Sequence, residues 1–456
     1  MRIAVGALLT AVAYAIWAAF GAASADIPQV QHIVVIFQEN RSPDNLFHGL
    51  QAYLPAADIA DSGVNSKGQT ITLTPVPLAD AYDLGHQHSS FLSMYDNGKM
   101  DGADLITCYP FAGQACPPNA QFAYVYPSDV APYFWLAIHF SFANRMFQSN
   151  QGPSFPAHQF IISGTSQLSA TNLYFAGDNP YEGQYGSAGC DAPSGKTVDA
   201  FGPKDAIKYV FPCFEHATLT DLLDNPPQGA RQGLTWRYYV PSEGSIWTAP
   251  NAIRHMCEPS GAPRTCNGPP FTNGQVVLDS AQILRDINAK TLPSVSWVIP
   301  TGQESDHPKG NDGTGPSWVA AVVNAIGQSA YWNNTVILLT WDDWGGWYDH
   351  VPPPLDPKYP WYENGFRVPL IVVSAYTPAG YVSQQTHTFG SILKFIESAY
   401  GLPLIPPGTF ADSRSDALMD FFDFSAKPRP FQAVPAEIPT DFFLHDKRPR
   451  NDPDDD

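Results

Sequence analysis

The sequence predicts an α/β fold in which helices flank a mostly parallel central sheet. Short, almost purely aliphatic runs recur along the chain, at 33–37, 295–299, 336–339 and 370–373. Runs of this composition are typical of strands that are buried on both faces, as in a parallel sheet. A helical pattern joins the second run to the third, as a strand–helix–strand unit requires.

The other elements follow from local signals. The helix between the second and third runs is expected over 317–329, directly after Pro316, a residue that is common at helix starts. A second helix is expected over 387–400, with Thr388 as its N-cap and Gly401 as its end.

Between these signals lies a range of a different character, from about 100 to 290. It is rich in Gly, Pro and aromatic residues and holds all six cysteines. One strand is expected in it, over 234–240. We interpret the remainder as long loop insertions over one face of the sheet.

The chain of 456 residues shows no linker that would divide it. Residues 1–25 have the pattern of a secretory signal peptide, with an early Arg, an apolar run and Ala23-Ser24-Ala25 as the cleavage site. The alternative is a membrane anchor, because the run approaches the about 18 residues that a span needs. We expect one domain over 26–445 and a disordered acidic tail over 446–456.

The cysteines form three close couples, and none of them has the C-x-x-C spacing of a metal site. Many connectivities are open to six cysteines, and pairing within each couple is the simplest. These couples are Cys108 with Cys116, Cys190 with Cys213, and Cys257 with Cys266. Disulfides persist in oxidising compartments, so we expect a secreted or periplasmic protein.

The charge of the chain limits its partners. The chain has 43 Asp+Glu and 24 Lys+Arg, which gives a formal net charge of −19. A nucleic-acid partner is excluded, because neutralising phosphates requires a basic surface. Anionic membranes are disfavoured for the same reason, whereas a zwitterionic headgroup is compatible with this charge. No integral membrane segment is expected in the mature chain.

Polar side chains follow the predicted strands. Glu39 and Asn40 follow the first strand, His307 comes shortly after the second, and Asp342 and Asp343 end the third. Ligands bind at the carboxyl ends of parallel strands. Clustered carboxylates raise one another's pKa, and a divalent cation bound to their oxygens removes that repulsion. Alone, the Asp pair could be a turn or a helix cap, but together with Glu39 and Asn40 it predicts a metal site.

Ser154 is the candidate nucleophile. It lies between Gly-Pro and Phe-Pro at an expected helix start, where backbone amides stabilise anions. The alternative role for this serine is a helix cap. Three histidines stand out in short polar motifs, namely His86, His307 and His350, and His88 could replace His86 in the same His-Gln-His run.

These segments together resemble the phosphoesterase family of bacterial phospholipases C and acid phosphatases, within the alkaline phosphatase-like superfamily. The matching segments occur in the same order as in the family and extend over about residues 30–405. It is carried by IVVIFQENRSPDNLFHG from Ile33, GHQHSSFLSMYDNGKMDG from Gly85, NQGPSFP from Asn150, SDHPKG from Ser305, LLTWDDWGGWYDHVPPP from Leu338 and RVPLIVVSAYTPAGYV from Arg367.

The resemblance implies an alkaline phosphatase-like fold and one divalent metal ion of unknown identity. Its implied ligands are Glu39, Asn40, Asp342, Asp343 and the oxygen of Ser154. The residues implied to line the phosphate pocket are Asn40, His86, His307 and His350. Pro43 and Asn45 depart from the family's first motif and alter the loop behind the ligands.

The implied activity is hydrolysis of a phosphoester substrate through a phosphoserine at Ser154. One histidine would protonate the leaving group, and His307 and His350 are equally suited. Phosphomonoesters and phosphatidylcholine-type diesters are both open as substrates. Ser154 and the Asp342-Asp343 pair favour the monoesters, because phospholipase members often carry Thr and Asp-Glu there. A non-catalytic secreted binding protein is a third reading, which the complete ligand set argues against.

Overall fold

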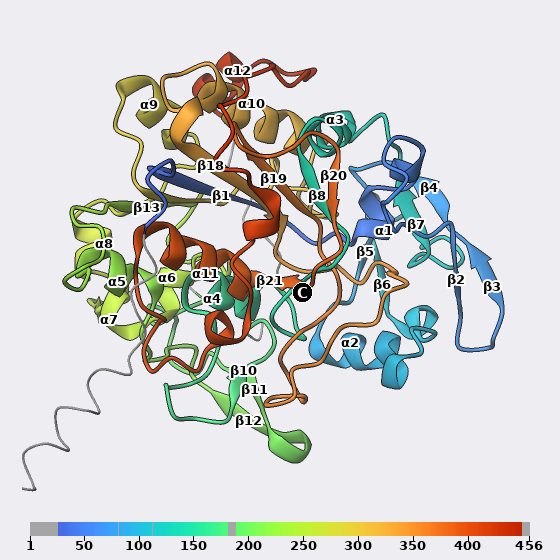
Figure 1. Ribbon diagram of the computed structural model, residues 1–456. Coiled ribbons are helices and arrows are strands. Elements are labelled where there is room, and N and C mark those ends of the chain that lie inside the picture. The colour runs from blue at the N-terminus through green and yellow to red at the C-terminus, as the bar shows by residue number, and fades with distance from the viewer. Residues whose placement is uncertain (1–25, 81, 112, 181–187, 449–456) are drawn as a thin grey trace, which may run out of the picture.

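The computed structural model describes residues 26–80, 82–111, 113–180 and 188–448 (Figure 1). The expected signal peptide and residues 449–456 of the expected tail lie outside the described residues. At the start of that tail, Arg448 forms ion pairs with Asp446 and with Asp312, so the chain is still tied to the fold there. None of the helices in the described ranges is long and apolar enough to span a membrane.

An eight-stranded sheet forms the centre of the fold. Its order is β16 (Val276–Val277), β13 (Trp236–Tyr239), β17 (Val295–Val298), β1 (His32–Gln38), β18 (Thr335–Trp341), β19 (Leu370–Ser374), β8 (Ser141–Ala143) and β20 (Tyr381–Ser383). All neighbours are parallel except the two pairs that β19 forms with β18 and β8. The predicted α/β fold with a mostly parallel sheet is confirmed.

The direction of β19 differs from the prediction. Its run at 370–373 was expected in a parallel arrangement, but it pairs antiparallel with β18, with Leu370 opposite Thr340 and Ser374 opposite Val336. All five residues of β19 are buried. A central strand is covered on both faces whichever way it runs, so its aliphatic composition carries no information about direction.

The register of β1 positions the polar residues that follow it. Gln38, the last residue of β1, lies opposite Trp341, the last residue of β18. The next residues, Glu39-Asn40 on one strand and Asp342-Asp343 on the other, therefore leave the sheet at the same edge. On its other side β1 pairs in parallel with β17, whose following loop carries His307.

Helices cover both faces of the sheet (Figure 1). On one side, α10 contacts α3, α9 and α12, and on the other side α4 packs against α11. The helices are α1 (Pro43–Leu46), α2 (His88–Tyr95), α3 (Ala131–His139), α4 (Ser154–Ser163), α5 (Leu219–Asp224), α6 (Ala249–Ala252), α7 (Arg254–Cys257), α8 (Pro269–Thr272), α9 (Gln282–Ala289), α10 (Gly315–Gly327), α11 (Phe389–Tyr400) and α12 (Thr440–His445).

Both predicted helices are confirmed. The first is α10, and the second is α11, which begins one residue after Thr388. The backbone N–H of Thr388 donates to Ser391 Oγ at 3.0 Å, as in a capping box. Gly401 ends α11 with a φ of 66°, in the left-handed region that glycine adopts without strain.

Smaller sheets lie around the central one. They pair β2 (Ser62–Val64) with β3 (Thr70–Thr72), β4 (Thr74–Val76) with β7 (Ala123–Val125), β5 (Tyr82–Leu84) with β6 (Cys108–Pro110), β9 (Met146–Phe147) with β21 (His387–Thr388), and β14 (Pro259–Ser260) with β15 (Thr265–Cys266). A three-stranded sheet has β11 (Val198–Gly202) between β10 (Phe175–Ala176) and β12 (Ala206–Val210).

The range from about 100 to 290 contributes more to the fold than loop insertions alone. It supplies β8, β13 and β16 of the central sheet and also α4. Of these strands only β13 is long enough to give a recognisable pattern, because β8 has three residues and β16 has two. The expected strand over 234–240 is confirmed as β13 and the expected helix start at Ser154 as α4, so the interpretation as insertions over one face is wrong for β8 and β16.

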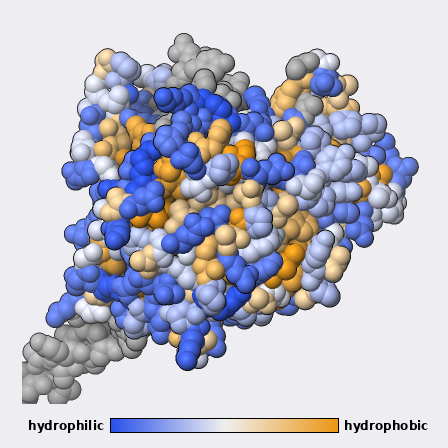
Figure 2. All heavy atoms as spheres, turned by 90° about the horizontal axis from the view of Figure 1, so that it is seen from above, coloured by the Kyte–Doolittle hydropathy of each residue, from blue (hydrophilic) through white to orange (hydrophobic). Residues whose placement is uncertain are grey.

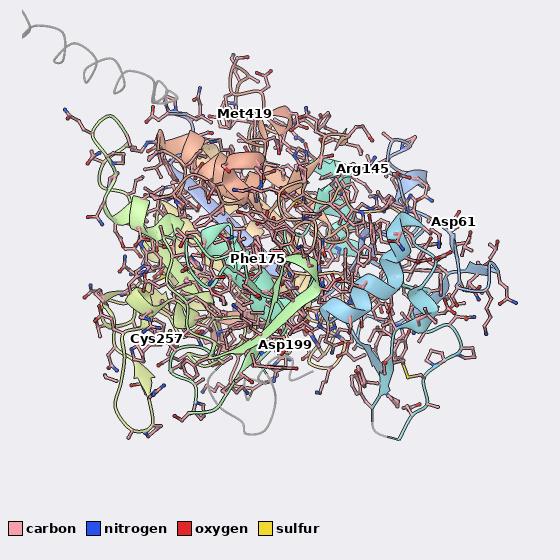
Figure 3. All side chains as sticks on the ribbon, turned by 90° about the horizontal axis from the view of Figure 1, so that it is seen from below. Asp61, Arg145, Phe175, Asp199, Cys257 and Met419 are labelled. Carbon is pink, nitrogen blue, oxygen red and sulfur yellow. A yellow bond between two sulfur atoms is a disulfide. The ribbon has the colours of Figure 1, made fainter. Side chains whose placement is uncertain are left out.

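The remainder of that range is closed by disulfides. They join Cys108 to Cys116, Cys190 to Cys213 and Cys257 to Cys266, which confirms the pairing within couples. The bonds of Cys190–Cys213 and Cys257–Cys266 pack together in one cluster, on the side of the molecule where Figure 3 labels Cys257, whereas Cys108 and Cys116 pack against a different cluster. Disulfides of this kind are maintained in oxidising compartments, and the protein is accordingly extracytoplasmic.

The core surrounds the sheet on both faces. All seven residues of β18 are buried, and so are six of the seven residues of β1. On the face shown in Figure 2, hydrophobic residues are interspersed with hydrophilic ones. The apolar content of the chain is thus used mainly in the interior, as expected for a chain of this length.

Candidate functional site

The turn after β1 brings Asn40 to the residues that end β18. Its backbone N–H donates to Asp342 Oδ1 at 3.0 Å. Asn40 has a φ of 58°, a left-handed conformation that asparagine tolerates better than most residues. On the other side of the contact, a Cβ at Gly345 would lie 2.2 Å from the carbonyl oxygen of Asn40. Glycine at position 345 is therefore required for this close approach.

Ser154 is the first residue of α4 and is completely buried. Its Oγ donates to Asp343 Oδ2 at 3.2 Å and lies 3.4 Å from Asn40 Oδ1. The other oxygen of Asp343 accepts the backbone N–H of Gly345 at 2.7 Å. The backbone N–H of Phe155 donates to Asn179 Oδ1 at 3.0 Å. The hydroxyl is thus held between an acid and an amide oxygen, at the positive end of a helix.

His158 follows Ser154 by one helical turn and joins two other predicted residues. Its Nε2 lies 3.3 Å from Glu39 Oε1 and 4.0 Å from Asp342 Oδ2. Burial lowers the pKa of His158 to about 4, and the charge of Asp342 opposes that shift. Sequence reasoning missed this histidine. The one available signal was its spacing of four residues from Ser154, which places both side chains on the same helix face.

These groups fit a cation. Ligand atoms of Glu39, His158 and Asp342 lie within 4.8 Å of one another, and all three residues are buried. Within the described residues, Asp342 Oδ2 is buried without a hydrogen-bond partner. A buried carboxylate that lacks a partner is unstable unless a cation or a proton compensates it. The three residues form a buried candidate metal site, with Asn40 and Ser154 next to it.

His86 and His307 lie together on the Asn40 side of this site. His86 Nδ1 lies 2.8 Å from the carbonyl oxygen of Leu84 and must therefore carry the proton. Its Nε2 then accepts from Asn40 Nδ2 at 3.1 Å. The rings of His86 and His307 are 6.3 Å apart between centroids. His307 Nδ1 accepts the backbone N–H of Lys309 at 3.3 Å, so a neutral His307 has its proton on Nε2.

His88, the alternative to His86, has a packing role. Its Nδ1 lies 2.9 Å from the carbonyl oxygen of Gln151, and its ring packs against Phe201 and Tyr362 at centroid distances of 4.4 Å and 5.6 Å. Burial lowers the pKa of His88 to about 4, with the Gln151 bond opposing the shift. Of the two histidines, the structure brings His86 to Asn40.

His350 lies in a different cluster from the one predicted. Its Nδ1 is 2.8 Å from Asp44 Oδ2 and its Nε2 is 3.1 Å from Asp58 Oδ1. Arg367 bridges Asp44 and Asp349 behind it, at 3.1 Å and 2.8 Å. Both ring nitrogens are thus engaged by carboxylates. Among its contacts in the described part of the chain, none is with the buried groups around Ser154.

This cluster changes the charge state of His350. Burial alone would lower the pKa of His350, but the hydrogen bond to Asp44 and the charges of Asp44 and Asp349 raise it to about 9. The imidazole is therefore a cation between acids at neutral pH, which is a structural role. A lone sequence motif does not reveal these partners, because Asp44 and Asp58 lie some three hundred positions upstream.

Asp306 links the three segments that carry the site. Its carboxylate accepts from Trp341 Nε1 at 2.9 Å and from the hydroxyl of Tyr133 at 3.2 Å. Its carbonyl oxygen accepts from Arg41 Nε at 2.9 Å. Arg41 follows Asn40, Trp341 precedes Asp342, and Asp306 precedes His307. Burial raises the pKa of Asp306 to about 7, with the charge of Arg41 opposing the shift.

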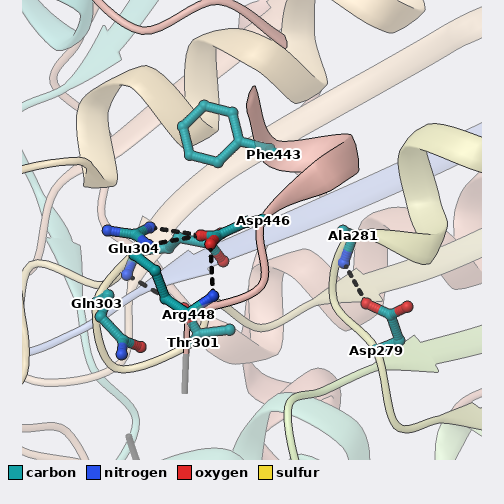
Figure 4. A pocket seen from close by; sticks show the side chains of 8 residues that line it. All are labelled: Asp279, Ala281, Thr301, Gln303, Glu304, Phe443, Asp446 and Arg448. Carbon is teal, nitrogen blue, oxygen red and sulfur yellow. Dashed lines mark hydrogen bonds and ion pairs between the residues drawn. The ribbon is translucent and has the colours of Figure 1, made fainter. Parts of the chain in front are cut away.

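A small pocket is lined in part by Thr301, Gln303 and Glu304, which precede His307 in its loop (Figure 4). It is lined by Asp279, Ala281, Thr301, Gln303, Glu304, Phe443, Asp446 and Arg448. None of these residues belongs to the cluster around Ser154. Burial raises the pKa of Glu304 to about 7, with bonds from Thr301 opposing the shift. The pocket is where the C-terminal segment packs against the loop.

Comparison with known proteins identifies relatives along most of the chain. The model of the Phosphoesterase family matches residues 30–403. The chain is similar to a hemolytic phospholipase C of Pseudomonas aeruginosa, with 25% identity over 419 residues that cover 82% of this chain and 53% of that protein. It is also similar to phospholipase C B of Mycobacterium tuberculosis, with 23% identity over 452 residues that cover 89% of this chain and 80% of that protein.

The chain spans about half the length of the Pseudomonas relatives that it matches. Among solved structures, a protein of the alkaline phosphatase superfamily from Vibrio parahaemolyticus matches 87% of this chain and 71% of its own. Its sequence identity is 10% and its TM-score is 0.37, a likeness too distant to support a conclusion.

Proposed function

The chain belongs to the Phosphoesterase family, and on that premise we propose that it is a metal-dependent phosphoester hydrolase with Ser154 as its nucleophile. One observation carries the proposal. The buried Ser154 Oγ lies within hydrogen-bonding distance of Asp343 Oδ2 and Asn40 Oδ1, beside a buried candidate metal site. A hydroxyl in this position meets the requirements of an activated nucleophile.

The proposed metal ligands are Glu39, Asn40, Asp342, Asp343 and the Ser154 oxygen. All five residues are buried, and the unpartnered Asp342 Oδ2 supports a cation among them. A bound divalent cation would lower the pKa of the Ser154 hydroxyl and offset negative charge on the phosphoryl group.

The side chains then divide the reaction between them. Ser154 Oγ attacks phosphorus, its proton passes to Asp343 Oδ2, and the bond from phosphorus to the leaving oxygen breaks. The positive end of the α4 dipole, where Ser154 lies, favours the negative charge of the phosphoryl group. His86 holds the amide of Asn40 through Nε2. Water then attacks phosphorus and loses a proton to solvent, the bond from phosphorus to Ser154 Oγ breaks, and Oγ takes back its proton from Asp343. The product is a phosphomonoester when the substrate is a diester, and phosphate when it is a monoester.

We assign to His307 a hydrogen bond from Nε2 that stabilises the leaving oxygen, which takes its proton from solvent water. When neutral, His307 carries a proton on Nε2, because Nδ1 accepts from Lys309. It is also buried next to His86. His350 is the weaker candidate, because both of its nitrogens are engaged by Asp44 and Asp58.

For the substrate, we propose a phosphodiester of the phospholipase C type. The relatives support this choice, since the similar proteins from Pseudomonas and Mycobacterium are named phospholipases C. The order of preference expected from the sequence, with monoesters first, is therefore reversed. Monoesters stay a second candidate because of Ser154 and the Asp342-Asp343 pair. The net charge of −19 suits a zwitterionic headgroup better than an anionic one.

An extracytoplasmic protein is either released from the cell or retained in the periplasm. We propose a secreted or periplasmic protein, which the three disulfides support. Fractionation of cells that express the full chain, followed by detection of the protein in medium and periplasm, tests this point.

The experiment on function compares two chromogenic substrates, p-nitrophenyl phosphorylcholine and p-nitrophenyl phosphate. The purified protein is assayed with both, before and after removal of metal by a chelator. The proposal expects hydrolysis of the diester to exceed that of the monoester and both to vanish on chelation. Activity that survives exhaustive chelation would contradict metal dependence, and a preference for the monoester would restore the second candidate.

A further inference from the structure

The orientation of His158 is fixed by its surroundings. The histidine is fully buried on α4, and its ring lies near the rings of Phe37 and Trp247, at centroid distances of 6.2 Å and 6.4 Å. One ring nitrogen points to the acids Glu39 and Asp342, and the other to Tyr238.

The hydrogen bonds of Tyr238 determine which nitrogen of His158 carries a proton. The hydroxyl of Tyr238 donates its one proton to the carbonyl oxygen of Trp247, at 2.7 Å. His158 Nδ1 lies 3.2 Å from the same hydroxyl oxygen, which can now only accept. Nδ1 must therefore donate. In a neutral imidazole, Nε2 is then left with a lone pair.

That lone pair faces two carboxylates. Nε2 lies 3.3 Å from Glu39 Oε1 and 4.0 Å from Asp342 Oδ2. Within the described ranges, Asp342 Oδ2 is a completely buried oxygen without a hydrogen-bond partner. Electron pairs that converge in this way repel one another unless a cation lies between them. The convergence of a buried imidazole nitrogen on an unpartnered carboxylate oxygen is the arrangement of a metal ligand set.

We propose that the metal held by Glu39 and Asp342 takes Nε2 of His158 as a further ligand, with Tyr238 as the residue that orients the ring. The inference rests on the proposed function, because it concerns the same metal centre. A hydrogen bond from the second nitrogen of a metal-bound histidine is the usual way in which its tautomer and orientation are set.

A nitrogen ligand changes which metal the site prefers. The oxygen ligands expected from the sequence alone suit Mg²⁺ and Ca²⁺ as well as Mn²⁺. Imidazole instead suits zinc and the later first-row transition metals. The geometry at His158 therefore selects Zn²⁺ or a transition metal cation over Mg²⁺ and Ca²⁺.

The first test measures metal binding alone, by calorimetric titration of the chelator-treated full chain with Zn²⁺ and with Mg²⁺. Loss of the ligand in His158→Asn should weaken Zn²⁺ binding by on the order of 100-fold and Mg²⁺ binding far less. The matched control is His216→Asn, because His216 is a buried histidine outside the site, bonded to the carbonyl oxygen of Ala217. It should alter neither affinity.

The second test has its main readout in the wild type, so it does not depend on the folding of a variant. Pulsed EPR of the wild-type protein loaded with Cu²⁺ detects coupling to the remote nitrogen of a bound imidazole. We expect this coupling in the wild type and in His216→Asn, and its loss in His158→Asn. Tyr238→Phe keeps the ligand but removes the acceptor of Nδ1, so it should shift the coupling and weaken Zn²⁺ binding roughly 10-fold.

The alternative is a His158 protonated on both nitrogens that orients Glu39 without binding metal. It predicts no nitrogen coupling and an equal loss of Zn²⁺ and Mg²⁺ affinity in His158→Asn, and either result would overturn the inference. Nitrogen coupling without hydrolysis of either p-nitrophenyl ester would sustain the inference and refute the proposed function. Chelator-sensitive hydrolysis without nitrogen coupling would sustain the proposed function and refute the inference.

Discussion

Ser154 and His158 lie one turn apart on the buried helix α4, and they reach different acids of one cluster. Ser154 Oγ donates to Asp343 Oδ2 at 3.2 Å, whereas His158 Nε2 lies 3.3 Å from Glu39 Oε1. One rigid element thus sets the proposed nucleophile and the proposed nitrogen ligand together. A shift of α4 would displace both, which couples the hydroxyl to the metal centre.

Replacement of the proposed nucleophile separates chemistry from folding. Ser154→Ala should lower kcat by at least about 1,000-fold, because the phosphoserine cannot form. Zn²⁺ binding should fall much less, since the acids stay in place. Steady-state kinetics and calorimetry measure the two effects. Ser163→Ala is the matched control: Ser163 is a buried serine at the other end of α4 and should be dispensable for activity. Full activity in Ser154→Ala would refute the assignment.

Asp306 should support both stability and turnover through its neighbours. Asp306→Ala leaves the buried donors of Trp341 and Tyr133 without an acceptor. The expected loss of unfolding free energy is about 2–4 kcal/mol, and kcat should fall because the loop of His307 loosens. Denaturant unfolding and kinetics give the two values. Tyr133→Phe removes one of these bonds and should cost only about 1 kcal/mol. An unchanged unfolding free energy in Asp306→Ala would contradict this role.

The sequence predicts the positions that follow β1 and β18 because neighbouring parallel strands end at the same edge. Glu39 and Asn40 could therefore be placed near Asp342 and Asp343 without coordinates. The Gly-Pro turn at a helix start makes Ser154 a candidate, and the resemblance to the family assigns it the role of nucleophile. Those inferences use local patterns and one topological rule. The structure adds the register, in which Gln38 lies opposite Trp341 and the residues after both strands leave the sheet at the same level.

The functions of the histidines could not be predicted in the same way, because they depend on distant partners. His158 stands in an apolar helix, where a histidine is usually only packed in the core, and its relation to Tyr238 requires the sheet order. His350 belongs to a conspicuous motif, yet Asp44 and Asp58 engage both of its nitrogens. The direction of β19 is equally invisible in its composition.

The pH dependence of stability should report on His350. Its pKa is about 9 in the folded state, above the ordinary 6.5. The charged ring thus contributes stability that is fully present below pH 6.5 and is lost as the pH rises through about 9. After allowance for solvent screening, the contribution is about 1–2 kcal/mol.

His350→Gln tests that contribution. The unfolding free energy of the wild type should approach that of the variant as the pH is raised from 6 to 10, when the two are followed by denaturant titration. A difference between the proteins that stays constant over this range would show that His350 is not a cation in the folded state.

The disulfide between Cys190 and Cys213 should stabilise the extracytoplasmic protein. It closes a loop with a sequence separation of 23 residues. Replacement of both cysteines by serine should lower the unfolding free energy by about 3 kcal/mol, as measured by denaturant titration under oxidising conditions. If the double variant unfolds at the same denaturant concentration as the wild type, the bond makes no contribution to stability.

The most direct test of the central claim is to trap the covalent intermediate. The metal-loaded wild type is mixed with p-nitrophenyl phosphorylcholine, quenched in acid within one turnover, digested and examined by mass spectrometry. The account predicts one added phosphorylcholine group on the peptide that contains Ser154, absent from the chelated protein and from Ser154→Ala. A modified histidine, or rapid turnover with no modified Ser154 at any quench time, would contradict it.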